Sequence, residues 1–163
     1  MTSLPSILAD VIGPGLALLP PAMDSRAARV MLVAIGLQES GFSTTRQYGG
    51  PAHSYWQFER GGGVKGVLNH PASKRHAEAA CAACKVNPVA VDLYAAMAEP
   101  KYQPLSAAMA RLLLYTDAHA LPVPLAVNQN DSWDYYLRNW RPGKPHPQAW
   151  AGHWMAALAA VPV

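Results

Sequence analysis

Glu39 combines an ionisable side chain with a position that should make its carboxyl a weak acid. It lies in the last turn of a predicted helix, residues 25–40, that is apolar on nearly every face. Burial among apolar residues and the negative end of the helix dipole both disfavour the carboxylate and raise its pKa. An acid that keeps its proton near neutral pH can protonate the leaving oxygen of a glycosidic bond. The plainer alternative, common at helix ends, is a Glu that points into solvent.

Glu59 is the nearest candidate for a second carboxylate, with Asp117 and Asp131 behind it. A paired carboxylate would favour water as the nucleophile in glycosidic cleavage. If residues 55–59 are extended, Gln57 and Glu59 point to the same face. Alternatively, Glu59 forms a surface ion pair with a base such as Arg60. The sequence leaves both alternatives open.

Two short strings around Glu39 resemble the signature of the soluble lytic transglycosylase and goose-type lysozyme superfamily. The first is Glu-Ser-Gly-Phe at 39–42, and the second is Ser-Tyr-Trp-Gln at 54–57, where that superfamily has a Gly-Leu-Met-Gln-like segment. The apolar stretch 109–118 is similar to a third motif, which ends in a Tyr-Asn-Ala-Gly-like string. The resemblance covers about residues 25–120, and the bulkier second string implies a bulkier substrate floor.

The resemblance implies cleavage of peptidoglycan between N-acetylmuramic acid and N-acetylglucosamine, with Glu39 first as acid and then as base. One carboxylate can be enough, because the N-acetyl group or the 6-hydroxyl of the substrate completes the reaction; Glu59 would instead favour water. No metal or organic cofactor is implied. The residues to which it gives roles at the substrate or beside Glu39 are Ser40, Gln57 and Tyr115, and Ser54 in the second string is a further substrate-binding candidate. Tyr55 and Trp56, beside Gln57, are candidates to line a glycan groove, because aromatic faces stack on the apolar faces of sugars. Gln57 could instead bond a loop backbone, and Tyr115 could be ordinary core.

Two other function classes fit the same residues. One is a non-catalytic peptidoglycan-binding or virion structural module that retains the fold. The other is a chitinase-like hydrolase that accepts unsubstituted chitin. Small size and the lack of a recognisable export signal are typical of a bacteriophage lysin or virion-associated lysozyme. We therefore expect synthesis in a host cytoplasm and action at the cell wall or within a phage particle.

Composition sets wider limits on the class of protein. The 163 residues suit a single domain over 1–163, and 51% of them are hydrophobic. A net charge of +3 suits an anionic polymer, but it is too small and dispersed to indicate nucleic-acid binding. The apolar stretch 4–22 is broken by Pro and Gly, so we expect no stable membrane insertion. We also expect a monomer.

Cys81 and Cys84, with His70 and His76 upstream, could on paper form a zinc site. The alanines at 79, 80, 82 and 83 predict a continuous helix, whereas zinc ligands at this spacing usually sit on a turn. We favour structural thiols in a helix over a metal site or a disulfide. The glycines at 61–63 lack the ending of a phosphate loop and indicate a mobile hinge or the rim of a groove.

The elements that must position these residues are mostly helices. The expected fold is mainly α, a lysozyme-like helical domain with at most a small β-ribbon around 55–58. Asp24 or Ser25 can cap the helix that carries Glu39, and Gly41 can end it in a left-handed conformation. Further helices are predicted over 73–84, 88–98, 105–119, 131–137 and 147–160, with a short first helix within 4–22. Some of the C-terminal aromatics could line a glycan groove, but helical spacing favours core positions for most of them: Trp133, Tyr135, Tyr136, Trp140, Trp150 and Trp154.

Overall fold

The computed structural model describes residues 2–163, and these are mainly helical, as the sequence predicts. Short helical turns at 8–12, 21–23, 60–64, 100–102 and 126–128 link the α-helices. The α-helices are α1 Leu4–Ile7, α2 Gly13–Leu16, α3 Arg26–Glu39, α4 Lys65–Asn69, α5 Lys74–Ala83, α6 Ala90–Ala96, α7 Gln103–Tyr115, α8 Gln129–Trp140 and α9 Pro147–Ala160.

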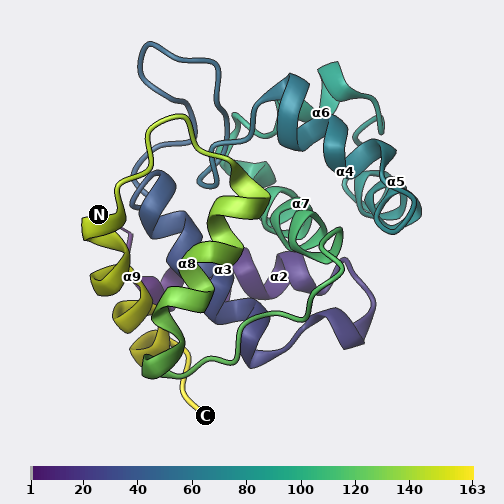
Figure 1. Ribbon diagram of the computed structural model, residues 1–163. Coiled ribbons are helices and arrows are strands. Elements are labelled where there is room, and N and C mark those ends of the chain that lie inside the picture. The colour runs from purple at the N-terminus through teal and green to yellow at the C-terminus, as the bar shows by residue number, and fades with distance from the viewer. Residues whose placement is uncertain (1) are drawn as a thin grey trace.

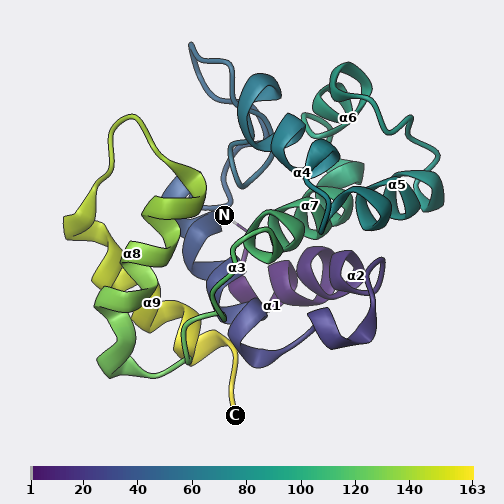
Figure 2. The same ribbon diagram turned by 45° about the vertical axis from the view of Figure 1, so that its right-hand side comes forward.

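The helix α3 runs through the middle of the molecule (Figure 1), with α8 and α9 on one side and α4 to α7 on the other (Figure 2). Every residue from Val30 to Gly36 is buried, which is why this segment is apolar on all faces. The helix packs against both α9 and α7. It is therefore the element that both halves of the fold share, and it ends at Glu39.

The two ends of α3 form as predicted. Ser25, not Asp24, is the N-cap: its Oγ accepts a hydrogen bond from the backbone N–H of Ala28 at 3.1 Å. Gly41 follows the helix with a φ of +61°, a conformation in which a side chain is disfavoured. Its N–H donates to the carbonyl oxygens of Gly36 and Leu37. These caps fix where the helix stops and therefore where the Glu39 carboxyl lies.

The predicted helices over 73–84, 88–98 and 147–160 are confirmed as α5, α6 and α9. The prediction over 105–119 was too late at its start and too long at its end, because α7 begins at Gln103 with Pro104 in its first turn and ends at Tyr115. The predicted helix at 131–137 is longer in the structure, extending over α8. The helix α4 was missed, because it follows three glycines that usually disfavour helix. Within residues 2–163, no helix has both the length and the apolarity that crossing a membrane requires.

The segment between α3 and α4 contains β-like pairing instead of named strands. Arg46 pairs with His53, and His53 pairs with Phe58, each as an isolated antiparallel bridge. The extended conformation considered for 55–59 is wrong at its start, because residues 54–57 form a tight turn closed by a hydrogen bond from the Gln57 N–H to the Ser54 carbonyl oxygen at 3.1 Å. This turn directs the chain back across the end of α3.

The two cysteines lie at the end of α5 as free thiols. Cys81 is fully buried in the core, and burial, followed by the nearby Cys84, raises the pKa of its thiol to about 11. A thiol held protonated in this way is a poor nucleophile and a poor metal ligand. Within residues 2–163, no group of three or more His, Cys, Asp or Glu side chains is arranged to hold a metal ion.

Candidate active site

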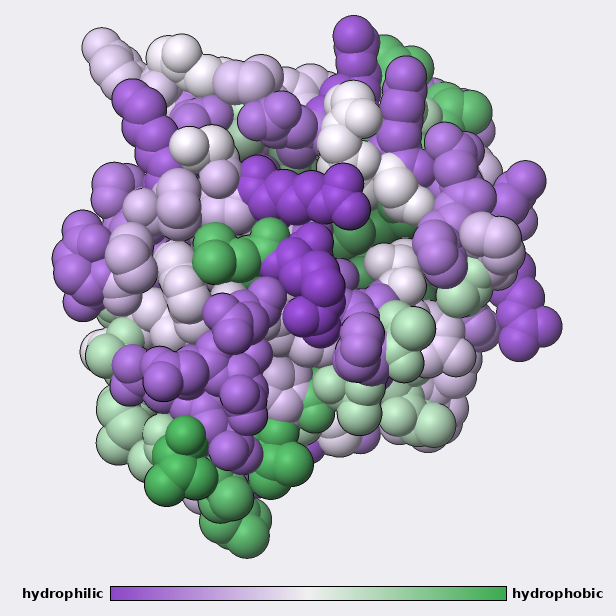
Figure 3. Space-filling view, viewed as in Figure 1, coloured by the Kyte–Doolittle hydropathy of each residue, from purple (hydrophilic) through white to green (hydrophobic). Residues whose placement is uncertain are grey.

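A cleft of about 1090 Å³ lies at the C-terminal end of α3. In the space-filling view, strongly hydrophilic side chains border a hollow that has apolar side chains at its bottom (Figure 3). Residues from several elements line this cleft: Gln38 and Glu39 of α3, the loop residues Gln47, Pro51 and Ala52, most of the residues between Gln57 and Gly66, Asn69 and His70 at the end of α4, Leu113 and Thr116 near the end of α7, and most of the residues between Tyr136 and His146. The predicted catalytic residues Glu39 and Glu59 both lie in it, as does Gln57.

The Glu39 carboxyl is held inside this cleft by a tyrosine from a distant part of the chain. The hydroxyl of Tyr136, on α8, donates a hydrogen bond to Glu39 Oε1 at 2.7 Å. Burial raises the pKa of Glu39 to about 7, and the hydrogen bond from Tyr136 opposes this rise without cancelling it. The expected weak acid is therefore present, and its proton is available close to neutral pH.

Tyr136 is itself fixed by aromatic neighbours. Its ring stacks on Trp150 of α9, with centroids 5.0 Å apart, and lies 5.3 Å from the ring of Trp133. Its side chain is 2% exposed, and burial followed by the charge of Glu39 raises the pKa of its hydroxyl. The hydroxyl thus stays a hydrogen-bond donor, oriented at Glu39 by the packing of two tryptophans.

The aromatic ring of Phe42, three residues after Glu39, packs back against α3. The Phe42 side chain lies against Gly36 of α3, where a Cβ would come within 2.1 Å of the Phe42 Cζ atom. Ser40 does not contact the Glu39 carboxyl, because its Oγ donates to the Tyr55 carbonyl oxygen at 2.7 Å and accepts from the Phe42 N–H at 3.1 Å. Ser40 therefore joins the helix end to the 54–57 turn.

Of the four residues in the 54–57 turn, only Gln57 lines the cleft. Trp56 is fully buried and donates from Nε1 to the Leu32 carbonyl oxygen at 2.9 Å, so the prediction that it lines a sugar groove is wrong. Ser54 is also buried and caps the turn by accepting from the Trp56 N–H. Tyr55 packs partly buried against Phe42 and does not reach the cleft lining.

Gln57 lies in the cleft but is not free of the backbone. Its Nε2 donates to the Ser54 carbonyl oxygen at 2.7 Å, which was the simpler alternative for this side chain. Ser54 and Gln57 have φ angles of +71° and +52°, uncommon for residues with side chains. Left-handed residues of this kind persist only where the surroundings impose them, and they are frequent at functional sites.

Glu59 also lines the cleft, in a very different setting from Glu39. It is exposed, and no hydrogen bond or ion pair holds its side chain within residues 2–163, so the suggested pair with Arg60 is not formed. The glycines at 61–63 follow it and also line the cleft. This segment, residues 59–63, is the glycine rim, and it agrees with the groove-rim alternative for these glycines.

Tyr115 does not hold Glu39, because Tyr136 occupies that position. Tyr115 is 43% exposed at the end of α7 and lies outside the cleft lining, beside His76 and the Arg111 guanidinium. Tyr115 lies on the outer side of α7 at the end of this helix. Contrary to the prediction, the tyrosine at the third motif position therefore does not hold the Glu39 carboxyl.

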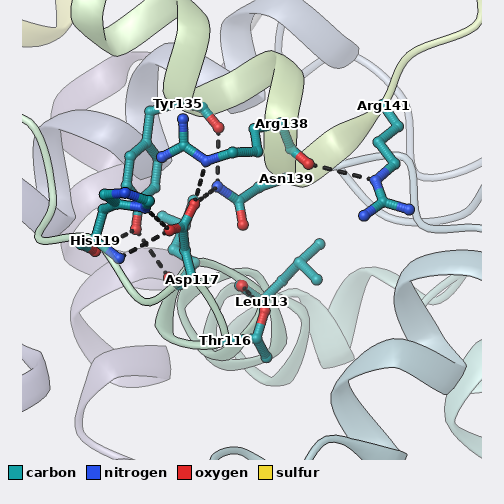
Figure 4. A network of polar contacts seen from close by, with 9 residues as sticks. Leu113, Thr116, Asp117, His119, Tyr135, Arg138, Asn139 and Arg141 are labelled. Carbon is teal, nitrogen blue, oxygen red and sulfur yellow. Dashed lines mark hydrogen bonds and ion pairs between the residues drawn. The ribbon is translucent and has the colours of Figure 1, made fainter.

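Asp117, considered as a possible second carboxylate, instead joins α7 to α8. It accepts hydrogen bonds from Arg138 Nε and Asn139 Nδ2, both at 2.8 Å, and from the His119 N–H at 2.9 Å (Figure 4). Although burial opposes its ionisation, these hydrogen bonds hold the pKa of Asp117 well below its usual range. Arg138 and Asn139 line the cleft, so Asp117 fixes part of the wall and does not supply a second catalytic group. Asp131, the other possibility, lies outside the cleft lining in the first turn of α8.

The C-terminal aromatics divide between core and cleft. Trp150 and Trp154 are buried, as predicted, whereas Tyr136 and Trp140 pack into the core and also line the cleft. The cleft positions of Tyr136 and Trp140 agree with the groove alternative for these aromatics, but the hydrogen bond of Tyr136 to Glu39 was not predicted. The one signal in the sequence was the Tyr136 hydroxyl, since a buried tyrosine needs a hydrogen-bond partner.

No protein-family model, no curated protein and no solved structure matches the chain. What the site can do must therefore be argued from its own chemistry. It presents one buried carboxyl with a pKa near 7, one tyrosine that orients it, and a cleft long enough for residues from α3, α7, α8 and the glycine rim to border it.

Proposed function

We propose that the chain cleaves the glycan strands of peptidoglycan, with Glu39 as the catalytic acid. The observation that carries the proposal is the Glu39 carboxyl, which lines the cleft, is largely buried, has a pKa raised to about 7 and accepts a hydrogen bond from Tyr136. Protonation of the leaving oxygen of a glycosidic bond needs an acid that retains its proton at the working pH. Glu39 meets this requirement and lies where a polymer could pass through an open cleft.

The form of the reaction follows from the number of carboxyls that can act. Glu39 would protonate the leaving oxygen and then, as a carboxylate, accept a proton from the attacking hydroxyl. An attack by the substrate's own 6-hydroxyl gives a 1,6-anhydro product, and an attack by water gives a reducing end. Tyr136 would keep the carboxyl in position throughout, because its hydroxyl can donate to either protonation state of Glu39.

The resemblance of residues 39–42 and 54–57 to lytic transglycosylases and goose-type lysozymes supports the same proposal. The resemblance implies that N-acetylmuramic acid and N-acetylglucosamine are the sugars on the two sides of the cleaved glycosidic bond. The rival functions are a binding module that lacks catalysis and a hydrolase of chitin. A binding module would have no need of a carboxyl whose burial raises its pKa, so we favour an enzyme that acts on bacterial cell wall, as a phage lysin does.

The test is product analysis with the wild type and Glu39→Gln. The glutamine keeps the size of the side chain and can still accept the Tyr136 hydrogen bond, but it cannot donate a proton to the leaving oxygen. We expect Glu39→Gln to lower release of soluble fragments from purified peptidoglycan by about 10³-fold, within the range for removal of an acid catalyst. Mass spectrometry of the wild-type products then distinguishes anhydro ends from reducing ends.

Two results would contradict the proposal. Undiminished lysis by Glu39→Gln would remove Glu39 from the reaction. Tight binding of peptidoglycan by the wild type without any product would favour the binding module, and products from chitin alone would favour the chitin hydrolase.

A further inference from the structure

The two walls of the cleft differ in charge. One wall of the cleft, here called the α8 wall, is formed by the end of α8 and by residues 141–146, and these six residues are called the strap. The charged groups of the α8 wall are all basic: Arg138, Arg141, Lys144 and His146. The facing side carries Lys65 and His70 together with the exposed carboxyl of Glu59. A ligand that carries negative charge is therefore attracted to the α8 wall and repelled by Glu59.

Two cations of this wall are free to bind a ligand. Arg138 is occupied by Asp117, with 2.8 Å between its Nε and Oδ2. By contrast, no carboxylate within residues 2–163 forms an ion pair with Arg141 or Lys144, and both are exposed. In the close view, Arg141 points away from the Asp117 cluster, with only its Nε bonded, at 3.4 Å to the Arg138 carbonyl oxygen (Figure 4).

Hydrogen bonds anchor the strap at both of its ends, so its backbone is attached to the border of the cleft. At its start, Trp140 Nε1 donates to the Trp56 carbonyl oxygen at 2.9 Å, and Arg141 reverses the chain with a φ of +49°. At its end, Gln38 Nε2 donates to the His146 carbonyl oxygen at 3.1 Å. Gln38 directly precedes Glu39, so the strap is attached beside the proposed catalytic acid.

The distance along α8 places Arg141 close to the reaction. Arg141 is the fifth residue after Tyr136, which contacts Glu39, and it directly follows the last residue of α8, Trp140. A helix rises about 1.5 Å per residue, so the helix advances roughly 6 Å along its axis from Tyr136 to Trp140. Both Tyr136 and Arg141 line the cleft. A long arginine or lysine side chain spans a further several ångströms. A charged substituent on a sugar beside the scissile bond is therefore within reach of the wall.

We propose that Arg141 and Lys144 bind carboxylates carried by the glycan strand, and that the cleft thereby selects acidic glycans over neutral ones of the same length. The inference rests on the proposed function and specifies its substrate: a strand whose lactyl or peptide carboxylates face α8. A fork of guanidinium donors is suited to a carboxylate, and the ammonium of Lys144 adds a second charge.

Binding to the inactive Glu39→Gln protein tests this without relying on cleavage. Calorimetry compares one neutral and one acidic probe of equal length. The neutral probe is the N-acetylglucosamine tetramer, and the acidic probe is the tetrasaccharide that alternates N-acetylglucosamine with N-acetylmuramic acid. We expect the acidic probe to bind about ten-fold more tightly at low salt and to lose this advantage as salt is raised. Adding Arg141→Gln and Lys144→Gln should abolish the difference and leave the affinity for the neutral probe within about two-fold.

The control for charge is the pair Lys74→Gln and Arg75→Gln, which removes the same two charges from exposed positions of α5 outside the cleft lining. It should leave the preference intact. Equal affinity for the two probes would overturn the inference and leave the proposed function standing, whereas failure of both probes to bind would count against the proposed function itself. A polyglycerol phosphate that binds in competition with the acidic probe, and more tightly, would also overturn it, because the wall would then be a phosphate site.

Discussion

The two carboxyls of the cleft, Glu39 and Glu59, lie in regions built in opposite ways. Glu39 ends a helix buried on all sides, and its carboxyl is bonded to a tyrosine that two tryptophans hold. Glu59 begins a run of glycines on an exposed edge, where nothing holds its side chain within residues 2–163. The same functional group thus becomes a weak acid in one region and a solvated charge in the other. Burial and a fixed partner, more than the residue type, decide which carboxyl can do chemistry.

The largest expected difference is in activity. Glu59→Gln should lower peptidoglycan cleavage by less than about ten-fold, against about 10³-fold for Glu39→Gln, because an exposed and unanchored carboxyl is not held in a productive geometry. Both variants are assayed at the same pH on the same purified substrate. A loss with Glu59→Gln as large as that with Glu39→Gln would instead mean that the two carboxyls act together, with water as nucleophile.

The next difference is in how stability depends on pH. The Glu39 pKa is about 7 in the folded chain and about 4.5 when exposed, so between these values the folded state binds more protons than the unfolded state. The free energy of unfolding should therefore fall as pH rises from 4.5 to 7, by up to about 3 kcal/mol from this group. Glu39→Gln should unfold like the wild type below pH 4.5 and be the more stable protein above pH 7.

Chemical denaturation at a series of pH values measures this difference directly. Glu59→Gln serves as the control for loss of one carboxyl from an exposed position. A Glu39→Gln curve that stays parallel to the wild-type curve throughout would show that the Glu39 carboxyl is not buried in solution.

Packing provides a third contrast between the two regions. An alanine at Gly36 would place its Cβ 2.1 Å from the Phe42 ring, whereas an alanine at Gly61 in the glycine rim would meet nothing within 4 Å. Overpacking costs about 1–3 kcal/mol, and the better helix propensity of alanine offsets up to about 1 kcal/mol of this at Gly36. We expect a net loss of about 1–2 kcal/mol for Gly36→Ala and a change under about 0.5 kcal/mol for Gly61→Ala, measured by thermal or chemical unfolding. Equal effects would mean that the rim is packed as tightly as the helix.

The smallest effect concerns the partner of Glu39. Tyr136→Phe removes the hydrogen bond that favours the ionised carboxyl, so the pKa of Glu39 should rise further, by about one unit or less. Because the acid must be protonated, the fall of activity at high pH should then occur at a higher pH than in the wild type. Tyr135→Phe is the matched control, since that hydroxyl donates to the Leu114 carbonyl oxygen and not to Glu39. If Tyr136→Phe instead moved the fall of activity to a lower pH, that result would contradict the assigned hydrogen bond.

The sequence by itself determined the features that depend on neighbouring residues. The apolar run with Ser25 before it and Gly41 after it fixed the helix α3, and with it the position of Glu39 in a last turn where its pKa should rise. The helical spacing of the C-terminal tryptophans likewise indicated their burial. These signals are local, because helix periodicity and caps are set within a few residues.

Only the tertiary structure decided which residues surround Glu39. Tyr136 lies 97 residues further along the chain, and it reaches Glu39 because α9 packs on α3 and α8 packs on α9. Tyr115 had the expected sequence position, but α7 turns it outward, and Trp56 beside the predicted substrate residue Gln57 became core. The basic wall was not foreseen either: its four basic residues all lie within residues 138–146, but only the folded chain, in which Gln38 bonds the strap, brings this segment to the cleft beside Glu39. Contacts of this range depend on how helices pack, and no pattern within one helix encodes them.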